Sequence, residues 1–123
     1  LLIIKYQKFI IIKRGITNVY LNFNEPCKLH FTGIGGISMS ALAENYVIKT
    51  FTVTGSDNPK ITDSAHLESL GAKIFYGQRK KNVSPDTDVL IYTAAVKKDN
   101  PELVAAREYG IPTLTRAEFL GQR

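Results

Sequence analysis

The sequence predicts an α/β domain with a doubly wound, mostly parallel sheet of five strands and helices on both faces. From Pro26 onward, short β-rich segments alternate with helical segments, and parallel strands need such crossovers. A glycine-rich turn, Gly33 to Ser38, also follows the first strand and opens the first helix. The 123 residues fit one domain of ordinary composition, with 44% hydrophobic and 22% charged residues.

The strands are expected wherever β-branched and aromatic residues gather in short runs. They span residues 28–32, 51–54, 72–76, 88–93 and 111–114. The second strand is expected to stop at Gly55-Ser56-Asp57, because Asn58-Pro59 follows as a turn signal. The fourth strand is apolar along most of its length, which is typical of a strand covered on both faces.

Helices are expected between these strands. Residues 37–48 have apolar residues at helical spacing, and the expected core positions are Ile37, Leu42 and Val47 or Ile48. The second helix begins at Thr62 or Asp63, either of which can cap it. It runs to Leu70, and Gly71 is well placed as its C-terminal glycine.

The last two helices have clearer end signals. Asn100 is an N-cap for residues 101–109, which begin with a proline, and Gly110 follows the last helical position. Thr115 opens a short final helix, with Glu118 three residues on at the spacing of a capping box.

The charge and cysteine content argue against several function classes. Residues 1–24 carry four basic residues and no acidic one, so the rest of the chain has 12 basic residues against 11 acidic ones. A nucleic-acid interface would place its basic face on the folded module, so nucleic acid is not an expected partner. The single cysteine, Cys27, excludes an intramolecular disulfide and argues against a metal cluster.

Residues 1–24 are expected to form an N-terminal extension, either an extra strand or a disordered tail, ahead of a domain at 25–123. The apolar runs of this extension are four residues long and lysines interrupt them. A membrane span needs ~20 apolar residues, and a signal peptide needs a continuous apolar stretch of about 7–15. We therefore expect no membrane partner and a cytoplasmic location.

The turn Gly-Ile-Gly-Gly-Ile-Ser has the pattern of a loop that binds the diphosphate of a nucleotide. Gly33 permits a tight exit from the strand, Gly35 lets a phosphate approach the backbone, and the first N–H groups of the next helix meet its charge. A dinucleotide fingerprint would have glycine in place of Ser38. Asp57 lies 24 positions after Gly33, close to the ~20 expected between such a turn and an acid that contacts a ribose. The alternative is a turn that only packs helix against strand.

Other polar residues are weaker candidates. Ser56 and Asp57 are either ribose contacts or plain turn residues, and Thr93-Ala94-Ala95 ends a strand at the edge where open sheets bind ligands. His30 is more typical of a hydrogen-bonded structural residue than of a catalyst. Residues 78–81 are typical of a solvated loop, with an anion contact as the alternative. No GxxxxGK[ST] loop for ATP phosphates and Mg²⁺ occurs, and no catalytic constellation is evident.

Five stretches of the chain occur together in a known family. They are HFTGIGGISMSALAE, TVTGSD, ESLGAKIFYGQ, DNPELVAAREYGIP and TRAEFL. In this order, over residues 28–120, they resemble the N-terminal domain of the Mur ligases, and most closely of members that add L-alanine to UDP-N-acetylmuramate. The resemblance implies a Rossmann-like domain that holds the UDP part of this substrate. The implied binding residues are Gly33, Ile34, Gly35, Gly36, Ile37, Ser38 and Met39 for the diphosphate, and Ser56, Asp57, Thr93, Ala94 and Ala95 for ribose and uracil.

The resemblance also implies that the chemistry lies outside this chain. In such ligases a central domain carries the ATP loop, and a C-terminal domain helps to close the site and bind the amino acid. The full-length enzyme would use ATP and Mg²⁺ to activate the muramate carboxylate as an acyl phosphate, which alanine attacks, in peptidoglycan precursor synthesis. This domain would bind no cofactor or metal and hold no catalytic residue, so as a truncated ligase it should not turn over alone.

Three departures from the family pattern stand out. Residues 1–24 have no counterpart, Thr50 stands where the family turns on glycine, and Gln78 replaces a histidine after Gly77. The second departure is expected to distort a helix-to-strand turn, and the third puts a base contact in doubt. Two other functions stay open: an NAD(P)-binding domain of an oxidoreductase, against which Ser38 counts, and a non-catalytic nucleotide-binding sensor.

Overall fold

A computed structural model of the chain describes residues 27–57 and 65–120. The expected N-terminal extension and the expected helix caps Thr62 and Asp63 lie outside the described residues.

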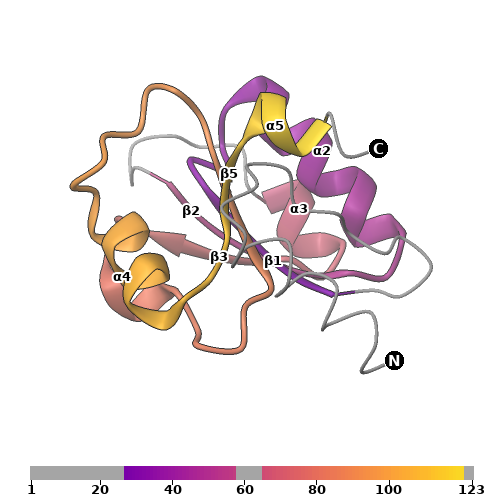
Figure 1. Cartoon of the computed structure of the whole chain (residues 1–123). Coiled ribbons are helices and arrows are strands. Elements are labelled where there is room, and N and C mark those ends of the chain that lie inside the picture. Colours follow the sequence, from indigo (N-terminus) through magenta and orange to yellow (C-terminus); the bar gives the residue numbers. More distant parts are fainter. Residues whose placement is uncertain (1–26, 58–64, 121–123) are drawn as a thin grey trace.

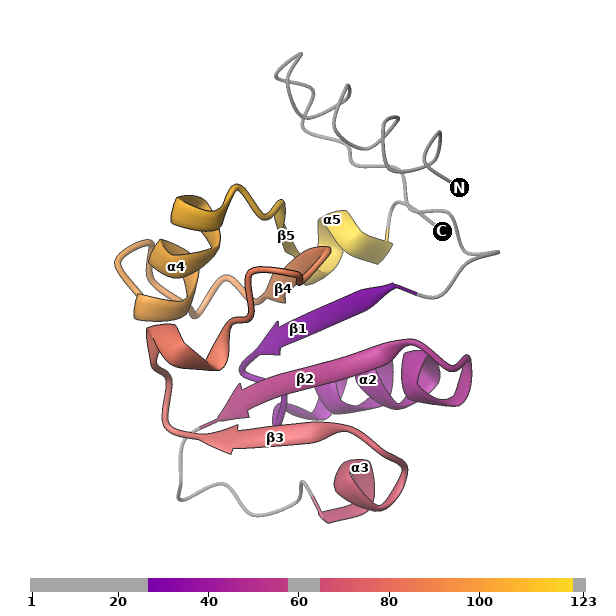
Figure 2. The same cartoon turned by 90° about the horizontal axis from the view of Figure 1, so that it is seen from below.

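The fold is a five-stranded parallel sheet with the order β3-β2-β1-β4-β5 (Figure 2). Its strands are β1 (Lys28–Thr32), β2 (Thr52–Asp57), β3 (Lys73–Tyr76), β4 (Val89–Tyr92) and β5 (Thr113–Thr115). Phe31 at the centre of the sheet pairs with Gly55 of β2 and with Ile91 of β4. The predicted doubly wound sheet is confirmed, and every pairing in it is parallel. The chain adds β2 and β3 on one side of β1 and then β4 and β5 on the other side. This change of side puts a topological switch point between the carboxyl ends of β1 and β4.

The helices cover both faces of this sheet, as predicted. They are α2 (Ile37–Ile48), α3 (Ala65–Ser69), α4 (Pro101–Tyr109) and α5 (Arg116–Leu120), with a 3₁₀ turn η1 (Lys80–Asn82) after β3. Figure 1 shows α2, α3 and α5 on one side and α4 on the other. The predicted caps are present: Asn100 Oδ1 accepts the N–H of Glu102, and Thr115 and Glu118 exchange both capping-box bonds.

The larger core lies between the sheet and the face of α2, α3 and α5. Alternate strand residues such as Leu29 and Phe31 pack there with Leu42 and Tyr46 of α2. Of the two core positions expected at the end of α2, Val47 is partly buried and packs against this core, whereas Ile48 is 66% exposed. Ile48 follows Tyr46 by two positions, about 200° around a helix, and so points away from the core.

Strand β2 is longer than predicted, because Gly55 lies inside it and does not end it. A Cβ at Gly55 would lie 2.5 Å from Ile34 Cδ1 and 2.8 Å from Ile34 Cβ, so the glycine leaves room for the turn after β1. The last strand also begins two residues later than predicted, at Thr113.

Three helix ends share one hydrogen-bond pattern. After α2, Thr50 N–H donates to Val47 O at 3.0 Å and Phe51 N–H donates to Tyr46 O at 3.0 Å. The same pattern, a Schellman motif, closes α3 at Gly71 and α4 at Gly110. Thr50 has a φ of 68°, in the left-handed region that favours glycine. The turn at Thr50 therefore keeps the hydrogen bonds of the two glycine turns, and the expected distortion is not seen in them. The strain lies in the left-handed backbone of Thr50.

Candidate functional site

The glycine-rich turn is a backbone loop fastened to the end of β2. Gly33 has a φ of 87°, which explains the need for glycine at the exit from β1. The N–H groups of Gly33 and Ile34 both donate to Ser56 O at 2.9 Å. Helix α2 follows with Gly36 as its N-cap, so it has no side-chain cap, and its first turn has no acidic residue. This arrangement suits an anion at the helix start.

Beside the turn, at the carboxyl edge of the sheet, lies a cleft of about 710 Å³. This volume is within the range of small-molecule sites. Its walls come from the ends of β1 to β4 and from the start of α4. The lining residues are Gly33, Asp57, Gly77, Gln78, Thr93, Ala95, Val96, Lys97, Asp99, Asn100 and Pro101.

Four of the predicted binding residues line this cleft, namely Gly33, Asp57, Thr93 and Ala95. Two others, Ile34 and Met39, are buried. The remaining predicted residues of the turn and helix start are Gly35, Gly36 and Ser38, which are partly or fully exposed, and Ile37, whose side chain is outside the described residues. Ala94 is exposed beside the lining residues of its strand end. Ser56 is fully buried, and its hydroxyl points away from the cleft.

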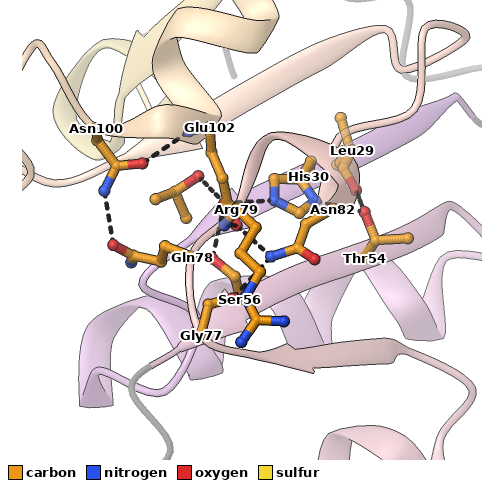
Figure 3. A network of polar contacts seen from close by, with 11 residues as sticks. Leu29, His30, Thr54, Ser56, Gly77, Gln78, Arg79, Asn82, Asn100 and Glu102 are labelled. Atoms are coloured by element: carbon orange, nitrogen blue, oxygen red, sulfur yellow. Dashed lines mark hydrogen bonds and ion pairs between the residues drawn. The ribbon is translucent and has the colours of Figure 1, made fainter.

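Behind the cleft, the fully buried carboxylate of Glu102 accepts five hydrogen bonds. Oε1 accepts from His30 Nε2 at 2.8 Å, Thr32 Oγ1 at 2.8 Å and Ser56 Oγ at 2.7 Å. Oε2 accepts from Asn82 Nδ2 at 2.7 Å and from Arg79 N–H at 3.3 Å. Figure 3 shows His30, Ser56, Arg79 and Asn82 around Glu102, which lies at the start of α4. We call Glu102 and its five donors the Glu102 network.

Burial raises the pKa of the Glu102 carboxyl, but hydrogen bonds and positive charge from His30, with hydrogen bonds from Asn82 and Ser56, outweigh it. The net effect is a pKa below the ordinary value, so the group is ionised at neutral pH. An ionised carboxylate only accepts hydrogen bonds, and therefore Nε2 of His30 carries a proton. His30 Nδ1 lies 2.7 Å from Thr54 Oγ1. His30 is thus hydrogen-bonded at both ring nitrogens, as predicted for a structural residue.

The Glu102 network was not predicted, although two signals for it are present. His30 and Thr32 are polar residues in a strand whose other residues after Lys28 are apolar, and buried polar groups require partners. Glu102 is an acid in the first turn of α4, the position that the helix dipole favours. Neither signal identifies which residue bonds to which.

The loop after β3 places the side chain of Gln78 in the cleft, where an amide of α4's N-cap holds it. Asn100 Nδ2 donates to Gln78 Oε1 at 2.6 Å, and both residues line the cleft. The neighbouring Lys80 is exposed and pairs with Glu108 at 3.1 Å, as expected of a solvated loop.

No three metal-ligating side chains lie together within residues 27–57 and 65–120. None of the helices that the structure describes has the length and apolar character to cross a membrane.

The sequence profile described as "Mur ligase family, catalytic domain" matches residues 28–123. A UDP-N-acetylmuramate–L-alanine ligase from Lachnoclostridium phytofermentans is 51% identical over 105 residues, which cover 84% of this chain and 22% of that protein. The crystal structure of a UDP-N-acetylmuramate–alanine ligase from Thermotoga maritima matches with a TM-score of 0.72 and 39% identity, over 76% of this chain and 22% of that one. A murein peptide ligase from Psychrobacter arcticus matches with a TM-score of 0.64 and 28% identity, over 71% and 18%. The chain thus spans about a fifth of the length of these relatives.

Proposed function

This chain belongs to the Mur ligase family, and we propose that it is the UDP-N-acetylmuramate-binding domain of a ligase that adds L-alanine to this substrate in peptidoglycan precursor synthesis. The observation that supports this most directly is the uncapped start of α2, placed by the turn at Gly33 beside a cleft at the switch point of the sheet. A phosphate group is among the anions that such a helix start binds.

The proposed contacts follow from where each group lies. The diphosphate lies on the backbone of Gly33 to Met39, and Asp57 at the end of β2 accepts hydrogen bonds from the ribose hydroxyls. Thr93 to Ala95 lie beside the uracil, where their small side chains leave room for the base. Ser56 acts indirectly, because its carbonyl holds the turn and its hydroxyl is bonded to Glu102.

The ATP and Mg²⁺ that this reaction requires do not fit the residues present here. The 123 residues contain no GxxxxGK[ST] loop, and the described ones hold no group of three metal-ligating side chains. No step of the ligation is therefore assigned to this chain, whose proposed part is to bind and orient the substrate. We expect no phosphate release when the chain is mixed with ATP, L-alanine, Mg²⁺ and UDP-N-acetylmuramate.

Titration calorimetry with UDP-N-acetylmuramate, UDP and NADH tests the binding proposal. Both UDP compounds should bind, and Asp57→Asn should weaken them about tenfold, the effect of one hydrogen bond to a charged group. His66→Gln, on the far smaller hollow between α2 and α3, is the matched control and should bind like the wild type. Binding of NADH without a response to either UDP compound, or no binding at all, would reject the proposal.

A further inference from the structure

The cleft and the Glu102 network are adjacent in sequence at the two central strand ends. Thr32 immediately precedes Gly33, and Ser56 immediately precedes Asp57. In each pair the first residue donates its hydroxyl to Glu102 and the second lines the cleft. The wall that faces the ligand is thus one peptide bond away from the buried carboxylate.

The loop after β3 also donates hydrogen bonds to this carboxylate, from one side-chain amide and one backbone N–H. Asn82 Nδ2 donates to Glu102 Oε2 at 2.7 Å and also to Gly77 O at 2.8 Å. Arg79 N–H donates to Glu102, and the residue before it is Gln78. Gly77 and Gln78 both line the cleft.

The fourth wall is the start of α4, which carries Glu102 itself. The N–H of Glu102 donates to Asn100 Oδ1 at 2.9 Å, and the other end of the Asn100 amide holds Gln78 at 2.6 Å. Figure 3 shows Asn100 and Gln78 on one side of this arrangement and His30 on the other.

We propose that Glu102 is the positioning residue of the cleft, a buried carboxylate that fixes its walls relative to one another and so determines the affinity for the UDP ligand without touching it. This inference rests on the proposed function. Glu102 is fully buried and does not line the cleft, which excludes direct contact in this arrangement. An ionised carboxylate is the protein group that accepts hydrogen bonds on two oxygens and donates none, as five converging donors require.

The substitution Glu102→Gln removes the negative charge and one acceptor oxygen but keeps the shape of the side chain. Its NH₂ group would face either the donors at Oε1 or the donors at Oε2. The Arg79 N–H and the Asn82 NH₂ cannot accept a hydrogen bond from it. The hydroxyl of Ser56, which now donates to Oε1, could accept one only if its hydrogen turned elsewhere. Glu102→Gln therefore keeps the volume of the side chain and loosens the walls.

The experiment compares the wild type, Glu102→Gln and Phe119→Leu, a volume-reducing change in the apolar core under α5. UDP affinity is measured by calorimetry at a temperature where circular dichroism shows all three folded. Amide hydrogen exchange at Gly33 and Ile34, whose N–H groups are bonded to Ser56 O, is measured by NMR. Thr32→Val, which removes one donor at similar volume, replaces Glu102→Gln if that variant does not fold.

Glu102→Gln should weaken UDP binding about tenfold, as expected for the loss of one hydrogen bond to a charged group. It should also speed exchange at Gly33 and Ile34 relative to the amide of Ile91 in the central sheet. Phe119→Leu should lower the melting temperature and leave UDP affinity unchanged. Wild-type affinity and unchanged exchange in Glu102→Gln would overturn the inference. If the wild type binds no UDP, the proposed function fails, and the exchange rates at Gly33 and Ile34 still decide whether Glu102 holds the turn.

Discussion

The two faces of the sheet are held to their helices by different kinds of interaction. On the face of α2, α3 and α5, the contacts are apolar, and Tyr46 packs edge-on against Phe51 with ring centroids 4.9 Å apart. On the face of α4, a smaller apolar cluster around Leu90 and Leu103 is joined by the hydrogen bonds of Glu102. Apolar packing tolerates changes of shape at modest cost, whereas a buried carboxylate specifies one set of partners. The cleft lies at the edge of the sheet where Glu102 and its hydrogen-bond donors are found.

The largest test of this contrast is the removal of the Glu102 carboxylate. Glu102→Ala leaves five donors buried without their acceptor, and the free energy of unfolding should fall by about 3–5 kcal/mol. Urea denaturation followed by circular dichroism measures it. Glu108→Ala on the same helix removes an exposed carboxylate and should change stability by about 0.5 kcal/mol or less. Equal losses in the two variants would contradict the contrast.

A second change disturbs the junction between the turn and β2. Gly55→Ala puts a Cβ 2.5 Å from Ile34 Cδ1, so the Ile34 side chain must move, at a cost of about 1–3 kcal/mol. Gly36→Ala is the control, because its Cβ would meet nothing closer than Gly33 O at 3.7 Å. A thermal melt that ranks Gly36→Ala as the more damaging change would refute this account of the turn.

Acid should weaken the α4 face through Glu102. The pKa of this carboxyl is lowered in the folded protein, so its contribution is complete above the unfolded value of about 4.3 and is lost as the pH falls through the lower folded value. Over that acidic window the wild type should lose more stability than Glu102→Gln. Parallel urea midpoints for the two proteins from pH 6 to acid would show that Glu102 contributes nothing to acid sensitivity.

The smallest expected effect is a gain on the apolar face, at the end of α2. Thr50→Gly relieves a left-handed backbone at φ 68° and should raise stability by about 1 kcal/mol. Thr50→Ala keeps a Cβ and should recover less of it. A lower melting temperature for Thr50→Gly than for the wild type would show that the threonine is not strained.

The features that were predictable from sequence depend on neighbours along the chain. The Asn100 cap and the capping box of Thr115 join residues two or three positions apart, and both were predicted correctly. Gly55 was misread as a strand end, because Ile34, which lies against it, is distant in sequence. The partners of Glu102 are 20 to 72 residues away, so no local pattern could identify them. For the same reason, only four of the eleven residues that line the cleft were among the predicted binding residues.

The five donors of Glu102 all precede it in the chain, and the first, His30, is 72 residues upstream. At ~5–20 residues per second, a ribosome takes about 4–14 s to make that interval. Within this interval the end of β2 is synthesised as well, 46 residues before the acceptor that it shares with β1. The walls of the cleft therefore cannot all be joined through Glu102 until α4 has been synthesised.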